Sequence, residues 1–227
     1  MQNTFVWEQV LIMKRLVLLL FAFTLATTVT AAENQKGDIH VGILISTAYP
    51  FLGTWGGEYY VNNYTQGIRH DAKLGKWSVG SDFEVIYFLD PHWAVGLKTG
   101  HNEFFQRVAS GVDERVGTDI FNIMFLTKYY FNPKGKIKYY MPVSLGVAFI
   151  EANINLDRKE EFNDIGFAAK IGLGAEYDLT ERWGTGVELK YNHNTFNTRE
   201  TTLSGDIVKL YPRANYFSFG VSLFYKF

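Results

Sequence analysis

The last fourteen residues of the chain, 214–227, constrain the fold more than any other stretch. They read ANYFSFGVSLFYKF, and every second residue from Phe217 to Phe227 is apolar or aromatic. Small or polar residues occupy most of the positions between them. Period two is the signature of a β-strand, because successive side chains point to opposite faces. The pattern therefore predicts a C-terminal strand whose two faces meet different environments.

Seven earlier segments repeat this alternation, each with its apolar positions on odd residue numbers. With the C-terminal strand, the segments are 39–49, 77–89, 93–100, 121–131, 139–149, 165–177, 183–192 and 214–227. Their length suits tilted strands that cross the hydrocarbon of a bilayer, for which ~9–11 residues suffice. The fourth segment is noisier, because Met124 and Leu126 fall on its otherwise polar face. We predict eight membrane-spanning strands.

The connections between these segments alternate in length. Three are short turns with the sequences Asp-Pro, Asn-Pro-Lys-Gly and Thr-Glu-Arg. The other four are longer, polar and irregular, at 50–76, 104–117, 152–163 and 194–213. Short periplasmic turns and long external loops are typical of bacterial outer-membrane barrels, and an open sheet edge is not tolerated in lipid. The predicted fold class is all-β, an eight-stranded antiparallel up-and-down transmembrane β-barrel.

Aromatic residues at outward positions support the same fold. One set lies beside the short turns: Tyr87, Trp93, Tyr129, Phe131, Tyr139, Tyr177, Trp183, Tyr225 and Phe227. A looser set lies at the other strand ends: Tyr49, Trp77, Phe149, Phe167, Tyr191 and Phe217. Two aromatic belts are what membrane interfaces favour. The alternative, a soluble sandwich or lipocalin-type barrel, would have to bury these rings in an interior too small for them.

The N-terminus reads as a targeting signal. Lys14 and Arg15 follow Met13, an apolar run covers 16–26, and small residues precede position 32. This is the pattern of a secretory signal peptide, with cleavage expected after Ala31 or Ala32. We expect residues 1–32 to be an N-terminal extension plus signal peptide whose true start is Met13, and residues 33–227 to be the barrel. The absence of Cys excludes disulfides, and a formal charge of −1 argues against nucleic-acid binding.

The signal peptide, the eight strands, the terminal aromatic strand and the stretch Y-x-L-T-x-R-W-G-x-G-x-E-L-K-Y at 177–191 resemble the small outer-membrane β-barrel domain family typified by OmpA and OmpW. The resemblance implies an outer-membrane location in a Gram-negative cell and a porin-family relationship. It also implies that the last strand is read by the barrel-assembly machinery, through Val221, Leu223, Tyr225 and Phe227. No peptidoglycan-binding domain follows the barrel here, so anchoring to the cell wall is not implied.

The inward positions of the predicted strands carry acids and lysines in equal number. The main candidates for ion pairs in the lumen are Asp82, Glu84, Lys98, Lys128, Lys170, Glu176, Glu188 and Lys190, with Asp178 and Lys226 in addition. Charges in a water-poor interior must be paired, and eight strands enclose little more than their own side chains. This favours a barrel filled by internal ion pairs. A narrow gated pore is the alternative.

Two further functions stay open. A lipid A deacylase of this architecture would carry a His-x-Ser motif on a late strand, where this chain has His193 and Thr195, with Glu200 further along. An adhesin would use the aromatic first loop, whose contact candidates are Trp55, Tyr59, Tyr60 and Tyr64. The alternative for these rings is that they pack over the mouth of the barrel as a lid. We expect no enzyme, no cofactor and no metal. The expected partners are outer-membrane lipids, lipopolysaccharide and the assembly machinery, around a monomer.

Overall fold

The computed structural model describes residues 33–49, 54–55, 72–73, 77–107, 115–155, 159–197, 199–203, 206–210 and 213–227. The predicted signal peptide and Met13 start lie outside these residues, as do Tyr59, Tyr60 and Tyr64. No helix in the described part of the chain is both long and apolar enough to cross a bilayer.

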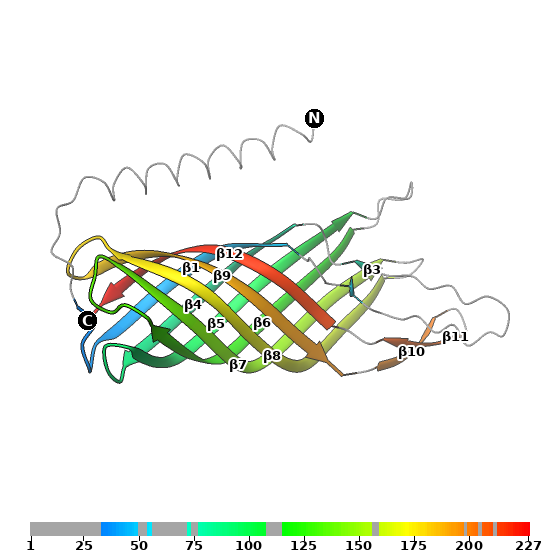
Figure 1. Cartoon of the computed structure of the whole chain (residues 1–227). Coiled ribbons are helices and arrows are strands. Elements are labelled where there is room, and N and C mark those ends of the chain that lie inside the picture. The colour runs from blue at the N-terminus through cyan, green and yellow to red at the C-terminus, as the bar shows by residue number, and fades with distance from the viewer. Residues whose placement is uncertain are drawn as a thin grey trace, which may run out of the picture.

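Eight strands close into one barrel (Figure 1). They are β1 (Ile39–Tyr49), β4 (Trp77–Phe88), β5 (Trp93–Arg107), β6 (Arg115–Tyr130), β7 (Ile137–Asn155), β8 (Lys159–Asp178), β9 (Trp183–Phe196) and β12 (Arg213–Lys226). Each pairs antiparallel with its neighbours in the chain, and β1 closes the barrel against β12. The predicted fold class is confirmed.

The barrel has two distinct ends. One end, which we call the turn end, holds the three short connections and the C-terminus; the opposite end is the loop end (Figure 1). Two small sheets belong to the long connections. They pair β2 (Thr54–Trp55) with β3 (Ala72–Lys73), and β10 (Arg199–Leu203) with β11 (Asp206–Leu210). The second of these sheets projects beyond the loop end (Figure 1).

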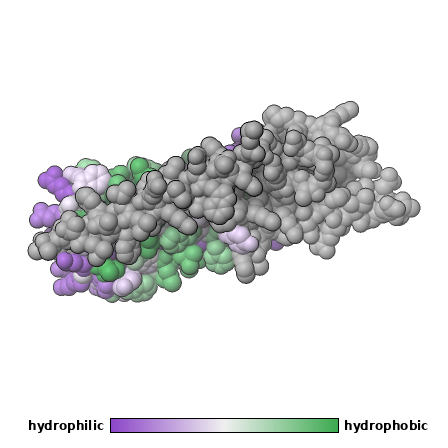
Figure 2. Space-filling model, turned by 90° about the horizontal axis from the view of Figure 1, so that it is seen from above, coloured by the Kyte–Doolittle hydropathy of each residue, from purple (hydrophilic) through white to green (hydrophobic). Residues whose placement is uncertain are grey.

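The two faces of the wall differ as the alternation predicts. In β1, β9 and β12 the even-numbered residues are the buried ones, apart from the last residue of β9, and the odd-numbered residues are exposed or partly exposed. Partners across the strands share the same parity, as Ile43 does with Leu223, so every strand turns its odd positions outward. Apolar residues therefore cover the wall, while hydrophilic residues gather at the turn end (Figure 2). This is the face arrangement of a barrel in lipid.

Several strands are longer than predicted, and the predicted irregular loops 104–117, 152–163 and 194–213 are wrong over much of their length. The last of these contains the end of β9 together with β10 and β11. Strand β5 pairs with β6 as far as Arg107 opposite Arg115, and β7 pairs with β8 as far as Asn155 opposite Lys159. Outside lipid a strand no longer needs apolar side chains, but its backbone hydrogen bonds still require partners. The apolar alternation therefore stops before the strands do.

The register fixes the tilt of the strands. Hydrogen-bonded partners, followed once around the barrel from Tyr216, lead back to β12 at Lys226, ten residues further along. A stagger of this size in an eight-stranded barrel corresponds to a tilt of about 40°. Eight strands enclose only a narrow lumen, and glycines make room for rings within it. Gly174 lies directly under the ring of Tyr140, where a Cβ atom would overlap it.

Candidate functional site

The middle of the lumen contains an ion cluster centred on Asp82. This carboxylate projects inward from β4. It meets Lys98 from β5, Lys170 from β8 and Lys190 from β9, because the even-numbered positions of these strands face the same interior. Its oxygens lie 2.5 Å from Lys190 Nζ, 3.3 Å from Lys98 Nζ and 3.4 Å from Lys170 Nζ. All four side chains are buried. One acid therefore holds three cations from three different strands.

Glu188 shares two of those lysines. Its carboxylate lies 2.9 Å from Lys190 Nζ and 3.3 Å from Lys98 Nζ, and it accepts a hydrogen bond of 2.9 Å from the Tyr140 hydroxyl. Glu188 has an accessible fraction of 1%. A charge so deeply buried is tolerated only when its oxygens are satisfied in this way.

A second group of contacts lies nearer the turn end. Lys128 Nζ lies 2.5 Å from Glu84 and 3.1 Å from Glu176, and Lys98 reaches Glu84 at 3.5 Å. The Tyr130 hydroxyl donates to both oxygens of Glu176, at 3.1 and 3.0 Å. The structure thus brings all eight predicted lumen residues into one continuous network.

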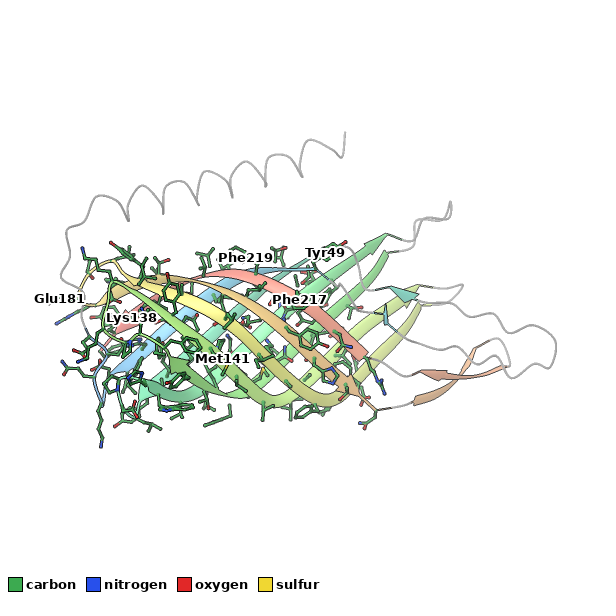
Figure 3. The ribbon with its side chains drawn as sticks, viewed as in Figure 1. Tyr49, Lys138, Met141, Glu181, Phe217 and Phe219 are labelled. Carbon is green, nitrogen blue, oxygen red and sulfur yellow. The ribbon has the colours of Figure 1, made fainter. Side chains whose placement is uncertain are left out.

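The mouth at the turn end holds a third group that sequence reasoning only partly found. Asp178 lies 2.5 Å from Lys226 Nζ and 2.9 Å from Lys138 Nζ, and Lys138 also donates to Asn34 Oδ1 at 2.7 Å. Figure 3 shows Lys138 at this end of the barrel. Its even number was the signal that could have identified it, but position 138 precedes the predicted segment. Asn34 precedes every strand and carried no signal.

The buried charges of the described lumen are therefore five acids and six lysines, rather than five of each: Asp82, Glu84, Glu176, Asp178, Glu188, Lys98, Lys128, Lys138, Lys170, Lys190 and Lys226. Close beside the mouth, the buried His40 ring packs against Phe88 and stacks on Phe224, with centroid distances of 4.6 and 5.4 Å.

Apolar side chains fill the space on both sides of the ion network. Towards the loop end the buried cluster is Ala48, Phe104, Ile120, Met124, Ala148, Ile150, Ala168, Ala214 and Tyr216. Towards the turn end it is Ile86, Phe88, Ala94, Leu126, Tyr130 and Tyr140. Met124 and Leu126, which disturbed the alternation of the fourth segment, belong to these clusters. The inner face is thus layered rather than uniformly polar.

The loop half of the lumen also contains buried polar atoms that have no hydrogen-bond partner. They include Ser78 Oγ, the side-chain amide of Asn122, Asn194 Oδ1 and the Tyr216 hydroxyl. Asn192 is the counter-example there, since its amide donates to Ser218 Oγ at 2.9 Å and to the Tyr216 carbonyl at 3.3 Å. Towards the turn end, both ring nitrogens of His40, Asn34 Nδ2 and Glu84 Oε2 also have no hydrogen-bond partner. The two ends therefore differ in charge, while each contains some unpartnered polar atoms.

The residues proposed for other functions fall on the outside of the barrel or outside the described side chains. His193 Nδ1 lies 2.6 Å from Asn215 Oδ1, so its described partner is an amide rather than a carboxylate. Glu200 lies in β10 and Trp55 in β2, and only their backbones are described. In the described residues no group of three His, Cys, Asp or Glu side chains could hold a metal ion.

Four residues are proposed as an assembly signal. Val221, Leu223 and Tyr225 lie on the outer face of β12, and Phe227 is the C-terminal residue. The Tyr225 ring contacts Trp183 and Phe227 at centroid distances of 5.0 and 4.8 Å, and its hydroxyl accepts from Arg182 at 3.2 Å. Phe227 has an accessible fraction of 74%. Around the turn end, Trp93, Tyr129 and Phe131 form a similar row of rings. These rings lie where the aromatic belt was predicted.

Comparison with known proteins places residues 16–227 of the chain among outer-membrane barrels. The family described as "Outer membrane protein beta-barrel domain" matches residues 16–227. Among solved structures, OprG from Pseudomonas aeruginosa aligns with a TM-score of 0.56 at 15% identity, over 86% of this chain and 98% of that one.

Two further structures have lower scores. The N-terminal β-barrel domain of Pseudomonas aeruginosa OprF has a TM-score of 0.45 at 15% identity, over 86% of this chain and all of that one. Outer Membrane Protein W from E. coli has a TM-score of 0.45 at 17% identity, with the same shares covered. Comparison with the sequences of curated proteins gives no match. At 15% identity the likeness to OprG shows the fold alone.

Proposed function

Because this chain belongs to the outer membrane protein beta-barrel domain family, we propose that it is a filled outer-membrane barrel that acts as a scaffold, holding extended strands and loops at the cell surface. Its role is structural or that of a surface for interactions. Passage of small solutes through the lumen is the alternative that this proposal rejects.

One observation carries the proposal: the lumen is crossed by a network of ion pairs that joins opposite walls. Lys98 and Lys190 bridge Asp82 on β4 to Glu188 on β9, and Lys128 bridges Glu84 to Glu176. Apolar clusters occupy the lumen towards both ends of this network. Opening a path would require several buried charges to lose their partners together, at a cost of several kcal/mol for each.

Single-channel recording in planar bilayers tests the proposal directly. The purified mature protein should give no steps of conductance in 1 M KCl between pH 5 and 8. A matched positive control is the variant Lys98→Ala, Asp82→Ala, Glu188→Ala, which removes the central contacts and shortens the side chains. If the unaltered protein conducts in regular steps, the filled-barrel proposal is wrong.

Delivery to the membrane is proposed to depend on Val221, Leu223, Tyr225 and Phe227. The support is their shared outward face on the last strand and the exposure of Phe227 at the turn end. Deleting Phe227 should lower the yield of folded barrel in cells, while refolding of the purified chain into detergent stays nearly unchanged. Equal cellular yields would remove the assembly role from this residue.

We further propose that the protein has no enzymatic activity on lipid A. The support is the described amide partner of His193, in place of the carboxylate that a catalytic triad needs. Mass spectrometry of lipid A from cells with and without the protein should show the same acylation. A lost acyl chain that depends on His193 would overturn this part of the proposal.

A further inference from the structure

The outer wall of the barrel carries a cavity near the loop end. Its volume is about 780 Å³, and it extends over β5, β6, β7 and β8 to Asn197, the residue after β9. Its apolar side is formed by Phe121, Phe149 and Ile165, all of which are exposed on the lipid-facing side of their strands. Its polar side includes His101, Asp119, Glu151 and Asp164. The Asp164 carboxylate already accepts hydrogen bonds from the backbone N–H and the side-chain amide of Asn197, at 2.9 and 3.4 Å. The cavity is therefore amphipathic.

The position of the cavity along the barrel axis places it at an edge of the apolar band. On β7, Tyr139 belongs to the aromatic row at the turn end and Phe149 lies ten residues further on. At ~3.3 Å per residue and a tilt of about 40°, these ten residues rise about 25 Å, the height of the apolar band of an outer-membrane barrel. Phe149 thus lies at the edge of the hydrocarbon, and Glu151 lies at the level of the headgroups.

The polar side has an excess of negative charge. Register places Glu103 opposite Asp119, and Asp119 opposite Glu151, so three carboxylates form a row across neighbouring strands. Like charges directly opposite each other destabilise a sheet. His101 Nε2 lies 3.1 Å from Asp119 Oδ1, and both of these side chains are roughly half exposed. A cation bound between Asp119 and Glu151 would offset this repulsion.

We propose that this cavity binds the headgroup and upper chain of an amphiphile with a primary amine, taken from the outer leaflet of the membrane. The ammonium group lies between Asp119 and Glu151, where it meets carboxylate oxygens. The first part of the hydrocarbon chain follows Phe121 and Phe149 down the wall and continues into the bilayer. An anionic headgroup has the wrong charge for this rim.

Spin-labelled lipids in vesicles measure such a preference. The protein is placed in phosphatidylcholine vesicles at pH 8 with EDTA, and the motionally restricted fraction is compared for spin-labelled stearylamine and spin-labelled stearic acid. The amine should be favoured by about twofold to fivefold, the range for exposed ion pairs. The variant Asp119→Asn, Glu151→Gln should bind the two labels equally, and Phe149→Ala should lower the amine's advantage.

Glu103→Gln is the matched control, because Glu103 lies in the same row of carboxylates but does not line the cavity. It should keep the preference for the amine. All of these side chains are outside the barrel core, so the variants should fold. The proposal is overturned if the unaltered protein restricts both labels equally, or if the double variant keeps the preference. Restriction of stearic acid alone, appearing when Ca²⁺ replaces EDTA, would also overturn it in favour of a bridging cation.

Discussion

The two halves of the lumen bury different kinds of polar group. From the middle to the turn end, acids and lysines from β4, β5, β6, β8 and β9 satisfy one another at 2.5–3.5 Å. Towards the loop end the buried polar groups are uncharged, and Asn122, Asn194, Ser78 and Tyr216 all have atoms without a partner. In the first half the acids and lysines are paired with one another, and the buried atoms without a hydrogen-bond partner are the two ring nitrogens of His40, Asn34 Nδ2 and Glu84 Oε2. The second half has no buried charges among the described residues, and its unpartnered atoms belong to neutral side chains.

This difference indicates which half of the lumen is more sensitive to the loss of a side chain. A buried ion pair that loses one partner leaves an uncompensated charge, so the paired half resists any change. An uncharged group that already has no partner loses nothing further when it is replaced by an apolar side chain of similar shape. Mutations should therefore be costly in the paired half and tolerated in the neutral half.

The largest expected effect comes from Asp82→Asn. The change leaves Lys98, Lys170 and Lys190 around a neutral amide in a water-poor interior. The free energy of unfolding, measured by urea titration in lipid vesicles with tryptophan fluorescence, should fall by about 3–5 kcal/mol.

A second variant tests whether that loss is due to charge. Adding Lys190→Met to Asp82→Asn removes one of the excess cations that Asp82 had neutralised. Part of the lost free energy of unfolding should return. If the double variant is less stable by the full sum of the two single changes, the cluster is not held together by charge balance.

Tyr140→Phe should have a smaller effect in the same half. The change removes only the hydroxyl that donates to Glu188 at 2.9 Å and keeps the ring that lies over Gly174. A hydrogen bond to a charged group contributes about 1.5–3 kcal/mol, and the same titration should show a loss in that range. Tyr139→Phe is the matched control, since Tyr139 faces outward and is more than half exposed. The free energy of unfolding of this variant should hardly differ from that of the unaltered protein. Equal effects of the two changes would mean that the inner hydroxyl has no special role.

Alternation along the sequence was enough to predict which residues share the lumen. The odd-even rule placed Asp82, Lys98 and Glu188 on one inner face although they lie on separate strands, because a closed barrel with aligned register brings all even positions together. Nothing in the sequence could say which acid meets which lysine. That depends on the stagger of the strands around the barrel.

The parts that were missed have identifiable physical reasons. Strands β5, β7 and β8 continue beyond the lipid, where the solvent no longer selects apolar side chains and the alternation ends. Lys138 was missed because the predicted segment began one residue too late, and Asn34 because it reaches the mouth from outside any strand. The outer cavity was missed because only strand pairing brings its lining residues together. Asp119 and Glu151, for example, are 32 positions apart in the chain.

The smallest expected effect separates two asparagines in the neutral half. Asn122→Leu replaces an amide whose donor and acceptor both lack partners with an apolar side chain of similar size. Its unfolding free energy should stay the same or rise by about 1 kcal/mol, since no hydrogen bond is lost and a buried polar group is removed. Asn192→Leu is the matched change at a satisfied site and should cost about 1–2 kcal/mol, because it removes the bonds to Ser218 and the Tyr216 carbonyl. If Asn122→Leu is the more damaging of the two, the neutral half is held by polar contacts after all, and the contrast between the halves does not stand.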